Sequence, residues 1–328
     1  MSASEPPSLI VDGLRFPPMF TEENVKSAQN YRPRDDDVIV VTYPKCGTTW
    51  TQVILSLIFT QGDPEGAKKL FASSPFLEHQ GSKEAETLER PCILKTHLPF
   101  GRAPWSDKAK YICVSRNPKD CCVSYFHHYK VHHSSLDFDH FFEMFIEGRV
   151  NFGDYFDYLK IWEEQRKNAN ILFLTYEEMK EDTKAAILKM ASFLDDEKYG
   201  EALRGNGNIL NDILKYSSPE NTKEFISSHR HGKVDQTKLP VCKGGMKHGK
   251  FAEGMKSDSQ DNEPDSTHLK GSQCNKHVGI DNILVRKAIV GDWRNQFSEE
   301  QSRRLDQKIL ERTIGSDFVN LHIWKKYM

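Results

Sequence analysis

The sequence predicts an α/β fold: a single domain, residues 1–328, with a central parallel sheet flanked by helices. Short apolar runs at 38–42, 92–94, 111–115 and 171–175 are typical of buried parallel strands. Helical patterns alternate with these runs, as right-handed βαβ units require. A chain of 328 residues, 38% of them hydrophobic, can bury one large core.

The helical patterns follow from the spacing of apolar residues and from capping signals. In the segment 182–194, Ile187, Met190 and Leu194 share one face, and Asp182 or Thr183 can cap its start. Near the end, Ser298-Glu299-Glu300-Gln301 has the pattern of a capping box. The expected helices before these are 47–60, 119–131, 138–147 and 154–167.

Two segments do not fit the strand–helix alternation. Residues 1–36 are charged and Pro-rich with apolar patches, which predicts an N-terminal arm lying on the domain. Residues 230–280 are rich in Gly, Lys, Ser, Asp, Asn and His and contain few large apolar residues. Such a polar segment cannot bury enough apolar surface to offset the entropy lost on ordering it. We therefore expect a mobile insertion near the functional site.

Composition narrows the class of protein. A net charge of −2 gives no basic surface for nucleic acid, and no apolar run approaches the ~20 residues that span a membrane. The N-terminus lacks the apolar core of a signal peptide. The cysteine count of 7 is odd, which favours reduced thiols. We therefore expect a cytoplasmic protein with neither a nucleic-acid nor a membrane partner.

The segment Tyr43-Pro44-Lys45-Cys46-Gly47-Thr48-Thr49-Trp50 lies between the first buried strand and the first long helix. A helix start offers unpaired N–H groups and a positive dipole end, and here a lysine and two threonines are added. The loop is therefore expected to hold a phosphate. It is not a Walker A loop, in which the lysine follows the second glycine, because Lys45 precedes Gly47.

The pattern Y-P-K-x-G-T-T-W resembles the 5′-phosphosulfate loop of cytosolic sulfotransferases. That family moves a sulfonate group from 3′-phosphoadenosine 5′-phosphosulfate (PAPS) to a hydroxyl or amine, and 3′,5′-ADP is the other product. The resemblance implies a P-loop-like phosphosulfate-binding loop in which residues 45–50 contact the cofactor. Cys46 stands where the family usually has Ser or Thr, so one hydroxyl donor is absent from the loop.

A second motif, Lys95-Thr96-His97-Leu98-Pro99, directly follows the run at 92–94. Side chains after a strand of an open α/β sheet project toward the ligand crevice. Sulfonation of a hydroxyl requires removal of its proton, and a neutral imidazole is a suitable base near pH 7. Taken alone, such a histidine is more often only a capped polar group. K-T-H-L-P resembles the family's base motif, which implies catalytic roles for His97, Lys95 and Lys45.

Two further motifs resemble the family's 3′-phosphate site. Arg116 follows the run at 111–115 and Ser124 lies in the next predicted helix. An arginine offers two parallel donors to a phosphate, although an isolated one at a strand end is more often in a surface ion pair. Arg286-Lys287-Ala288 resembles R-K-G, with alanine in place of glycine. A positive φ at Ala288 would carry a penalty.

The adenine and acceptor sites are less specific in the sequence. Trp50 offers a flat face for stacking, and the resemblance implies that Tyr176 and Ser217 also contact the adenine. Pro219 replaces an aromatic residue of the family there. A small phenolic or alcoholic acceptor is expected in an apolar pocket. Its candidate lining is the phenylalanines of 71–76, Phe126, Phe152, Tyr155 and Phe156, each of which could equally belong to the core. His132 and His133 are further candidates to reach this region.

Several alternatives stay open. The scaffold also suits a small-molecule P-loop kinase, a catalytically silent nucleotide-binding protein, or an enzyme that uses sulfonation to dehydrate an alcohol. Residues 294–303 match the family's dimerisation element poorly, so a monomer or weak homodimer is expected. A metal site is also conceivable from the Cys and His residues of one segment, Cys242, His248, His268, Cys274 and His277. Their spacing fits no zinc pattern, so no metal is expected.

Overall fold

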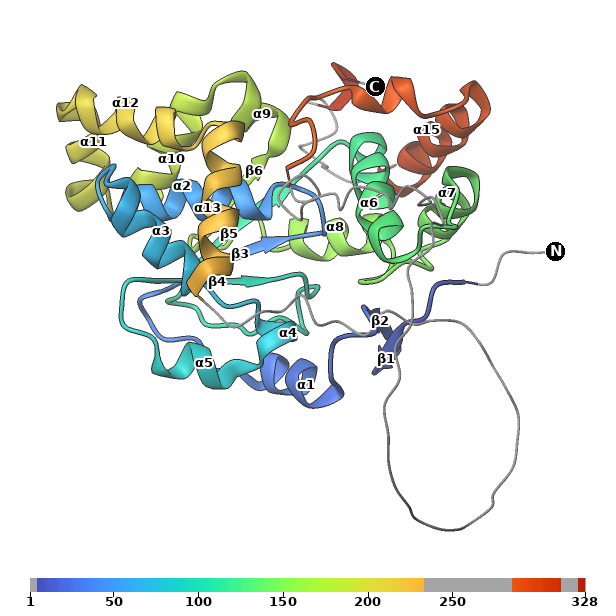
Figure 1. Ribbon diagram of the computed structural model, residues 1–328, viewed down its shortest axis with the longest axis horizontal. Helices are drawn as coiled ribbons and strands as arrows, with labels where there is room; N and C mark the ends of the chain where they lie inside the picture. The colour runs from blue at the N-terminus through green and yellow to red at the C-terminus, as the bar shows by residue number, and fades with distance from the viewer. Residues whose placement is uncertain (1–4, 233–284, 314–323, 328) are drawn as a thin grey trace, which may run out of the picture.

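A four-stranded parallel sheet forms the centre of the molecule (Figure 1). The computed structural model describes residues 5–232, 285–313 and 324–327. The strands lie in the order β4-β3-β5-β6, and all four runs predicted from the sequence are confirmed. Their bounds are β3 (Asp37–Thr42), β4 (Cys92–Thr96), β5 (Lys110–Ser115) and β6 (Ile171–Thr175).

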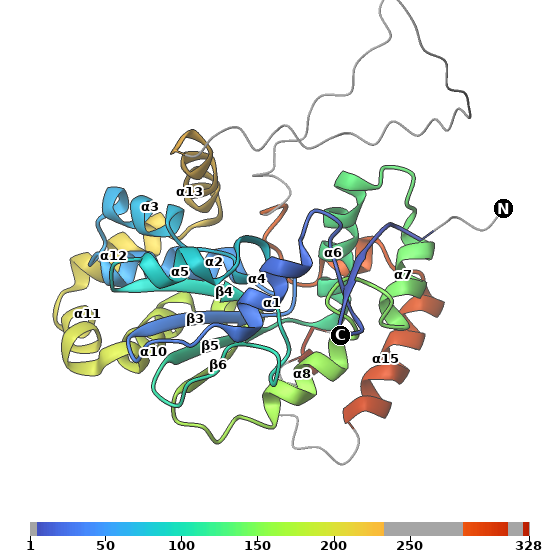
Figure 2. The same ribbon diagram turned by 90° about the horizontal axis from the view of Figure 1, so that it is seen from below.

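The sheet separates two apolar layers, as alternation along a strand requires. Val38 and Val40 belong to one core cluster, whereas Ile39 and Val41 belong to the other. Helices supply the rest of each layer, on the two faces of the sheet (Figure 2). The first layer includes α2 (Thr48–Phe59), α10 (Thr183–Asp195) and α12 (Gly207–Tyr216); the second includes α6 (Pro118–His132), α7 (Phe138–Ile146), α8 (Tyr155–Glu163) and α15 (Glu299–Thr313).

The predicted long helices are present, and two capping predictions are confirmed. Asp182 accepts the Ala185 N–H at the start of α10 at 2.8 Å. Ser298 and Gln301 exchange two hydrogen bonds of 3.0 and 3.2 Å before α15. Several helices escaped prediction. Most of them are short, namely α1 (Glu22–Asn30), α3 (Pro64–Ala72), α4 (Leu77–Gln80), α5 (Ser82–Thr87), α9 (Tyr176–Glu181), α11 (Glu201–Gly205), the π-helical turn Asp196–Gly200 and the 3₁₀ turn Asp292–Asn295; the longer one is α13 (Pro219–Gly232).

The N-terminal segment has more structure than the predicted arm. β1 (Leu9–Val11) and β2 (Leu14–Phe16) form an antiparallel hairpin, and its turn places Asp12 and Gly13 at φ 49° and 78°. Phe16 is fully buried and its ring lies 5.4 Å from that of Phe152, so the hairpin is anchored in the core. The predicted mobile insertion falls almost entirely on residues outside the described ranges, as do the five Cys and His residues rejected as metal ligands. None of the helices described is long and apolar enough to cross a bilayer.

Candidate active site

Three neighbouring strands end at one cavity of about 1280 Å³. The segments that follow β3, β4 and β5 contribute Lys45, His97 and Arg116 to its lining, as expected for the carboxyl edge of a parallel sheet. The segment 285–289 and the helix α6 complete this side of the cavity. Among the described lining residues the charged ones are all cations, namely Lys45, Lys95, Arg116, Lys180, Arg286 and Lys287.

The loop after β3 has the geometry of an anion site. Gly47 is the N-cap of α2 at φ 107°, and Lys45 is left-handed at φ 70°. A Cβ at Gly47 would lie 3.1 Å from Cδ2 of Tyr176, so both backbone and space require glycine here. The Oγ1 atoms of Thr42 and Thr48 are 2.5 Å apart, which ties the start of α2 to the end of β3.

Arg116 braces this loop. Its Nη1 donates to the carbonyl of Lys45 at 3.2 Å, and its guanidinium lies 4.4 Å from the ring centroid of Tyr176. Its Nε is buried and has no partner within the described structure. Burial, together with the nearby charge of Arg116, lowers the pKa of Lys45 to about 8. The two cations therefore lie close together where no carboxylate of the described lining separates them.

The segment after residue 284 brings two more cations to the cavity. Arg286 and Lys287 both pair with Asp292, the latter at 2.8 Å between Nζ and Oδ1. Buried Nε of Arg286 has no partner among the described groups. Ala288 has a positive φ of 55°, so alanine carries at this position the conformational penalty that glycine would avoid. Trp293 is buried.

His97 is held in a defined orientation. Its Nδ1 lies 2.7 Å from the carbonyl oxygen of Thr42. A carbonyl only accepts, so Nδ1 must carry the proton and Nε2 of the neutral ring keeps its lone pair. Phe76 and Phe152 flank the imidazole, with ring centroids at 4.9 and 5.2 Å. Burial lowers the pKa of His97 to about 3, so the ring is neutral at physiological pH.

Glu78 supports this histidine and was missed in the sequence. Its carboxylate accepts the backbone N–H of His97 at 2.5 Å and the hydroxyl of Thr96 at 2.9 Å. Burial raises the pKa of Glu78 to about 7 and lowers that of Lys95 to about 8. Glu78 lies in the four-residue helix α4, which is too short to produce a periodic signal.

Most of the predicted site residues line the cavity. Two do not, because their side chains point into the protein. Cys46 is fully buried, with its Sγ 3.7 Å from that of Cys121. The Ser217 hydroxyl donates to the carbonyl of Leu214 at 3.4 Å, and its own carbonyl accepts the indole N–H of Trp50 at 2.8 Å. The residues brought together are Lys45, Gly47, Thr48, Thr49, Trp50, Lys95, His97, Arg116, Ser124, Tyr176, Arg286, Lys287 and Ala288.

The apolar end of the cavity differs in part from the expected acceptor pocket. Phe76 and Phe152 line it, and so do His132 and His133. Phe126 instead packs on α7, with its ring centroid 5.3 Å from that of Phe138. Phe71, Tyr155 and Phe156 are also absent from the described lining. The prediction missed many lining residues that no motif marks, among them Pro17, Pro18, Met19, Phe20, His79, His128 and Tyr129.

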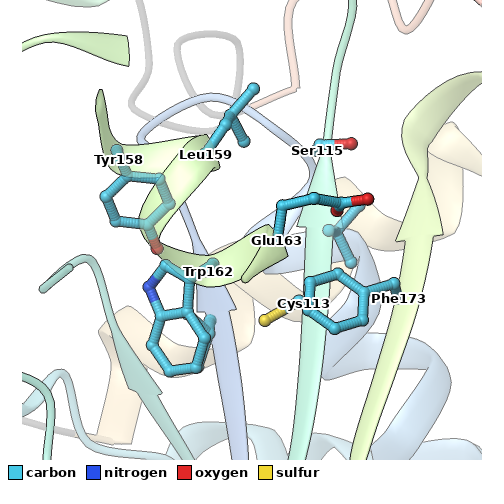
Figure 3. Close-up of a pocket in the computed structure, with 9 residues that line it drawn as sticks. Cys113, Ser115, Tyr158, Leu159, Trp162, Glu163 and Phe173 are labelled. Atoms are coloured by element: carbon cyan, nitrogen blue, oxygen red, sulfur yellow. The ribbon is translucent and has the colours of Figure 1, made fainter. Parts of the chain in front are cut away.

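A second cavity lies between α8 and the strands β5 and β6 (Figure 3). Its lining includes Cys113, Trp162 and Phe173, and its volume is about 20 Å³. A space of this size holds about one water molecule, so it cannot take a substrate. Within the described ranges, no group of three or more His, Cys, Asp or Glu side chains could hold a metal ion.

Comparisons with known proteins agree with this geometry. Residues 35–263 match the model of the sulfotransferase domain. Sulfotransferase 1 family member D1 of Mus musculus is 32% identical over 304 residues, which cover 88% of each chain. Amine sulfotransferase of Oryctolagus cuniculus is 32% identical over 309 residues, 92% of this chain and 87% of the relative.

A solved structure extends the likeness to the fold. Mouse sulfotransferase SULT7A1, complexed with PAP, superposes with a TM-score of 0.68 at 25% identity, over 98% of this chain and 99% of that one. The matches in sequence and in fold thus cover the strands, the loop 43–50 and His97 together. The chain therefore belongs to the sulfotransferase family.

Proposed function

We propose that this protein transfers the sulfonate group of PAPS to a hydroxyl or amine of a small, phenolic or alcoholic acceptor. The observation that carries the proposal is the single cavity that holds the loop 43–50 and His97 together. One part of the lining is cationic and suits a phosphorylated nucleotide. The part around His97 is apolar and suits an uncharged acceptor.

The residues present fit PAPS. Arg116 and Arg286 each keep a buried Nε without a partner in the described structure, which an anion would satisfy. Lys45 and the N-terminus of α2 would hold the 5′-phosphosulfate. Arg116, Ser124, Arg286 and Lys287 would hold the 3′-phosphate. Trp50 and Tyr176, whose ring centroids are 5.6 Å apart, would hold the adenine, while Cys46 and Ser217 would act only through the backbone and through Trp50.

The chain's own residues account for the chemistry. When bound, PAPS supplies the sulfonate group and 3′,5′-ADP is released. His97 Nε2 accepts the proton of the acceptor hydroxyl, since Thr42 fixes the opposite nitrogen as a donor. Lys45 stabilises the charge that develops on the departing phosphate oxygen. Phe76 and Phe152 exclude water around the imidazole. Lys95 adds positive charge beside His97.

We also propose a cytoplasmic location and a monomer or weak homodimer. The cysteines that the structure describes are all free and buried, as is typical of reducing compartments. Sedimentation at micromolar concentration tests the oligomeric state, and a stable dimer would contradict it.

Two measurements test the function. Calorimetry with PAP should detect binding, and sulfur-labelled PAPS should label at least one member of a panel of phenols, catecholamines, steroids and aliphatic alcohols. Turnover of ATP with Mg²⁺ in place of PAPS would favour a kinase. PAP binding without transfer would indicate a silent protein, and an alkene product would indicate dehydration. Absence of PAP binding would overturn the proposal.

A further inference from the structure

The helix α6 presents a histidine to the cavity that the proposed reaction does not use. His128 lies one helical turn after Ser124, so both face the same side of α6, and both line the cavity. His132 lies a further turn along and also lines it. The cavity lining therefore continues along this helix from the cationic region toward a group of imidazoles.

The Nδ1 of His128 needs a partner. It is shielded from solvent and hydrogen-bonds to no described atom. The ring centroids of Tyr125 and His132 lie 6.2 and 6.3 Å away, and neither ring supplies a bond to Nδ1. Buried polar atoms in folded proteins are nearly always satisfied, by protein, water or ligand. A ligand in the same cavity can supply the missing bond.

His128 shares the lining of one cavity with Lys45 and His97. Lys45 and His97 both act electrostatically on its ring, and burial is the main cause that lowers the pKa of His128 well below its usual value. A neutral imidazole offers one donor and one acceptor nitrogen. It therefore suits a hydroxyl or other neutral oxygen group whichever nitrogen carries the proton.

The charges of the lining indicate which acceptors fit. The described lining contains six cations, Lys45, Lys95, Arg116, Lys180, Arg286 and Lys287, and neither Asp nor Glu. An ammonium group on the acceptor would lose its water without gaining a carboxylate partner. A second hydroxyl would meet no such cost.

We propose that His128 is a specificity-determining residue that selects a neutral acceptor with two oxygen groups, one that His97 deprotonates and one that hydrogen-bonds to His128. This inference rests on the proposed sulfotransferase activity and narrows its acceptor class. A diphenol is preferred over a simple phenol, and both are preferred over a phenol that carries an amine.

The test compares acceptors that differ in one group. Initial rates with PAPS are measured for 4-methylphenol against 4-methylcatechol, and for 4-ethylphenol against tyramine. His128→Phe keeps an aromatic ring and removes the hydrogen bond, whereas His128→Asn places an amide near Nδ1. His140→Phe is the control, since His140 also has a buried unpartnered nitrogen, Nε2, but lies on α7 outside the described cavity lining. PAP binding is measured for each variant.

Wild-type protein should favour the catechol in kcat/KM by about five- to tenfold, the effect of one hydrogen bond. His128→Phe should reduce the ratio of kcat/KM for 4-methylcatechol to that for 4-methylphenol to about the ratio of the intrinsic reactivities of the two compounds. His128→Asn should restore part of the preference. His140→Phe should leave it unchanged, and all variants should bind PAP as the wild type does.

Three results would overturn the inference: no catechol preference in the wild type, a preference that His128→Phe leaves intact, or tyramine turned over better than 4-ethylphenol. Loss of PAP binding or of all PAPS-dependent transfer in the wild type is a different result, because it rejects the proposed function itself. If His128→Phe does not fold, the His128→Asn ratio and the wild-type ratios decide.

Discussion

At the scale of single residues, the backbone carbonyl of Thr42 determines which nitrogen of His97 can accept a proton. The 2.7 Å contact to Nδ1 leaves Nε2 as the basic atom. Arg116 has a different position, against the loop carbonyl of Lys45 at 3.2 Å. Substitution of His97 should therefore affect turnover, whereas substitution of Arg116 should affect nucleotide binding.

His97→Gln should lower kcat by at least about a hundredfold, since an amide cannot act as a base, while the PAP dissociation constant changes by less than about threefold. Arg116→Lys keeps the charge and loses the planar fork, so it should weaken PAP binding by about tenfold or more. Calorimetry and steady-state rates measure the two effects. A His97 variant with normal turnover would remove this residue from the role of base.

The pKa of Lys45, lowered to about 8 by burial and by Arg116, predicts a pH dependence of nucleotide binding. Lys45 is charged below this pH and neutral above it, and an anion binds the charged form better. PAP affinity should therefore fall as the pH rises through about 8. Lys45→Arg, whose side chain stays charged, should bind PAP with little change over the same range. Equal pH profiles for the two proteins would contradict the assignment.

Below neutral pH, the reaction rate should not depend on the protonation of His97. Burial lowers the pKa of His97 to about 3, so the base stays neutral between pH 5.5 and 7.5. The rate with an alcohol acceptor should therefore show no loss near pH 6.5 from this group. An ordinary exposed imidazole would lose its basic form there.

The predicted site residues that the structure brings to one cavity are mostly those whose residue type is itself diagnostic. Lys45, His97 and Arg116 follow strand ends and carry chemistry that few other residues supply. Cys46 and Ser217 were placed in the lining by motif alone, yet their side chains point into the protein. A motif fixes the order of the backbone and leaves the direction of a side chain to its packing. Glu78 and His128 have no motif, so only the fold reveals them.

At the scale of elements, the start of α2 is the most constrained feature. Gly47 combines φ 107° with a space in which a Cβ would lie 3.1 Å from Tyr176. The amides that follow it can point at an anion only while this conformation holds.

Gly47→Ala should destabilise the protein by about 1–2 kcal/mol and weaken PAP binding, because alanine is strained at this φ. Chemical denaturation and calorimetry measure the two effects. Gly205→Ala is the matched control, since nothing lies within 4 Å of a Cβ placed there and its φ is ordinary. It should be neutral or slightly stabilising. Equal losses in both variants would show that the position of the glycine is unimportant.

Strands were predicted better than short helices, for a physical reason. The runs in β3 and β5 are buried on both faces, so their apolar signal is continuous. The helices α4 and α5 have four and six residues, and contacts with α1 and with each other hold them in place. Local sequence carries little of that information. The N-terminal hairpin was missed similarly, because Phe16 is buried against distant Phe152.

At the scale of the whole molecule, the part of the cavity that we propose for the nucleotide joins segments from residue 44 to residue 289. Segments far apart in the chain must be folded together before the cavity exists. A ligand that binds this cavity therefore stabilises the fold as a whole.

PAP at a hundred times its dissociation constant should raise the unfolding free energy by about 2.7 kcal/mol, seen as a higher Tm by thermal denaturation. Arg116→Lys, tested at the same PAP concentration, should show a smaller rise. Adenosine, which lacks the phosphates, serves as the control ligand. A rise with adenosine as large as that with PAP would show that the cations of the cavity contribute nothing.

The cationic lining has a kinetic consequence as well. Lys45, Arg116, Arg286 and Lys287 line a partly enclosed space whose described lining contains neither Asp nor Glu, and one carboxylate behind it, Asp292, pairs with both Arg286 and Lys287. Such a field draws a polyanion inward from bulk solution, and dissolved ions screen it over about 10 Å at 0.1 M. Encounter between nucleotide and protein should accordingly slow as ionic strength increases, while the lifetime of the complex changes less. The charges that line this cavity therefore raise the association rate of the nucleotide as well as its affinity.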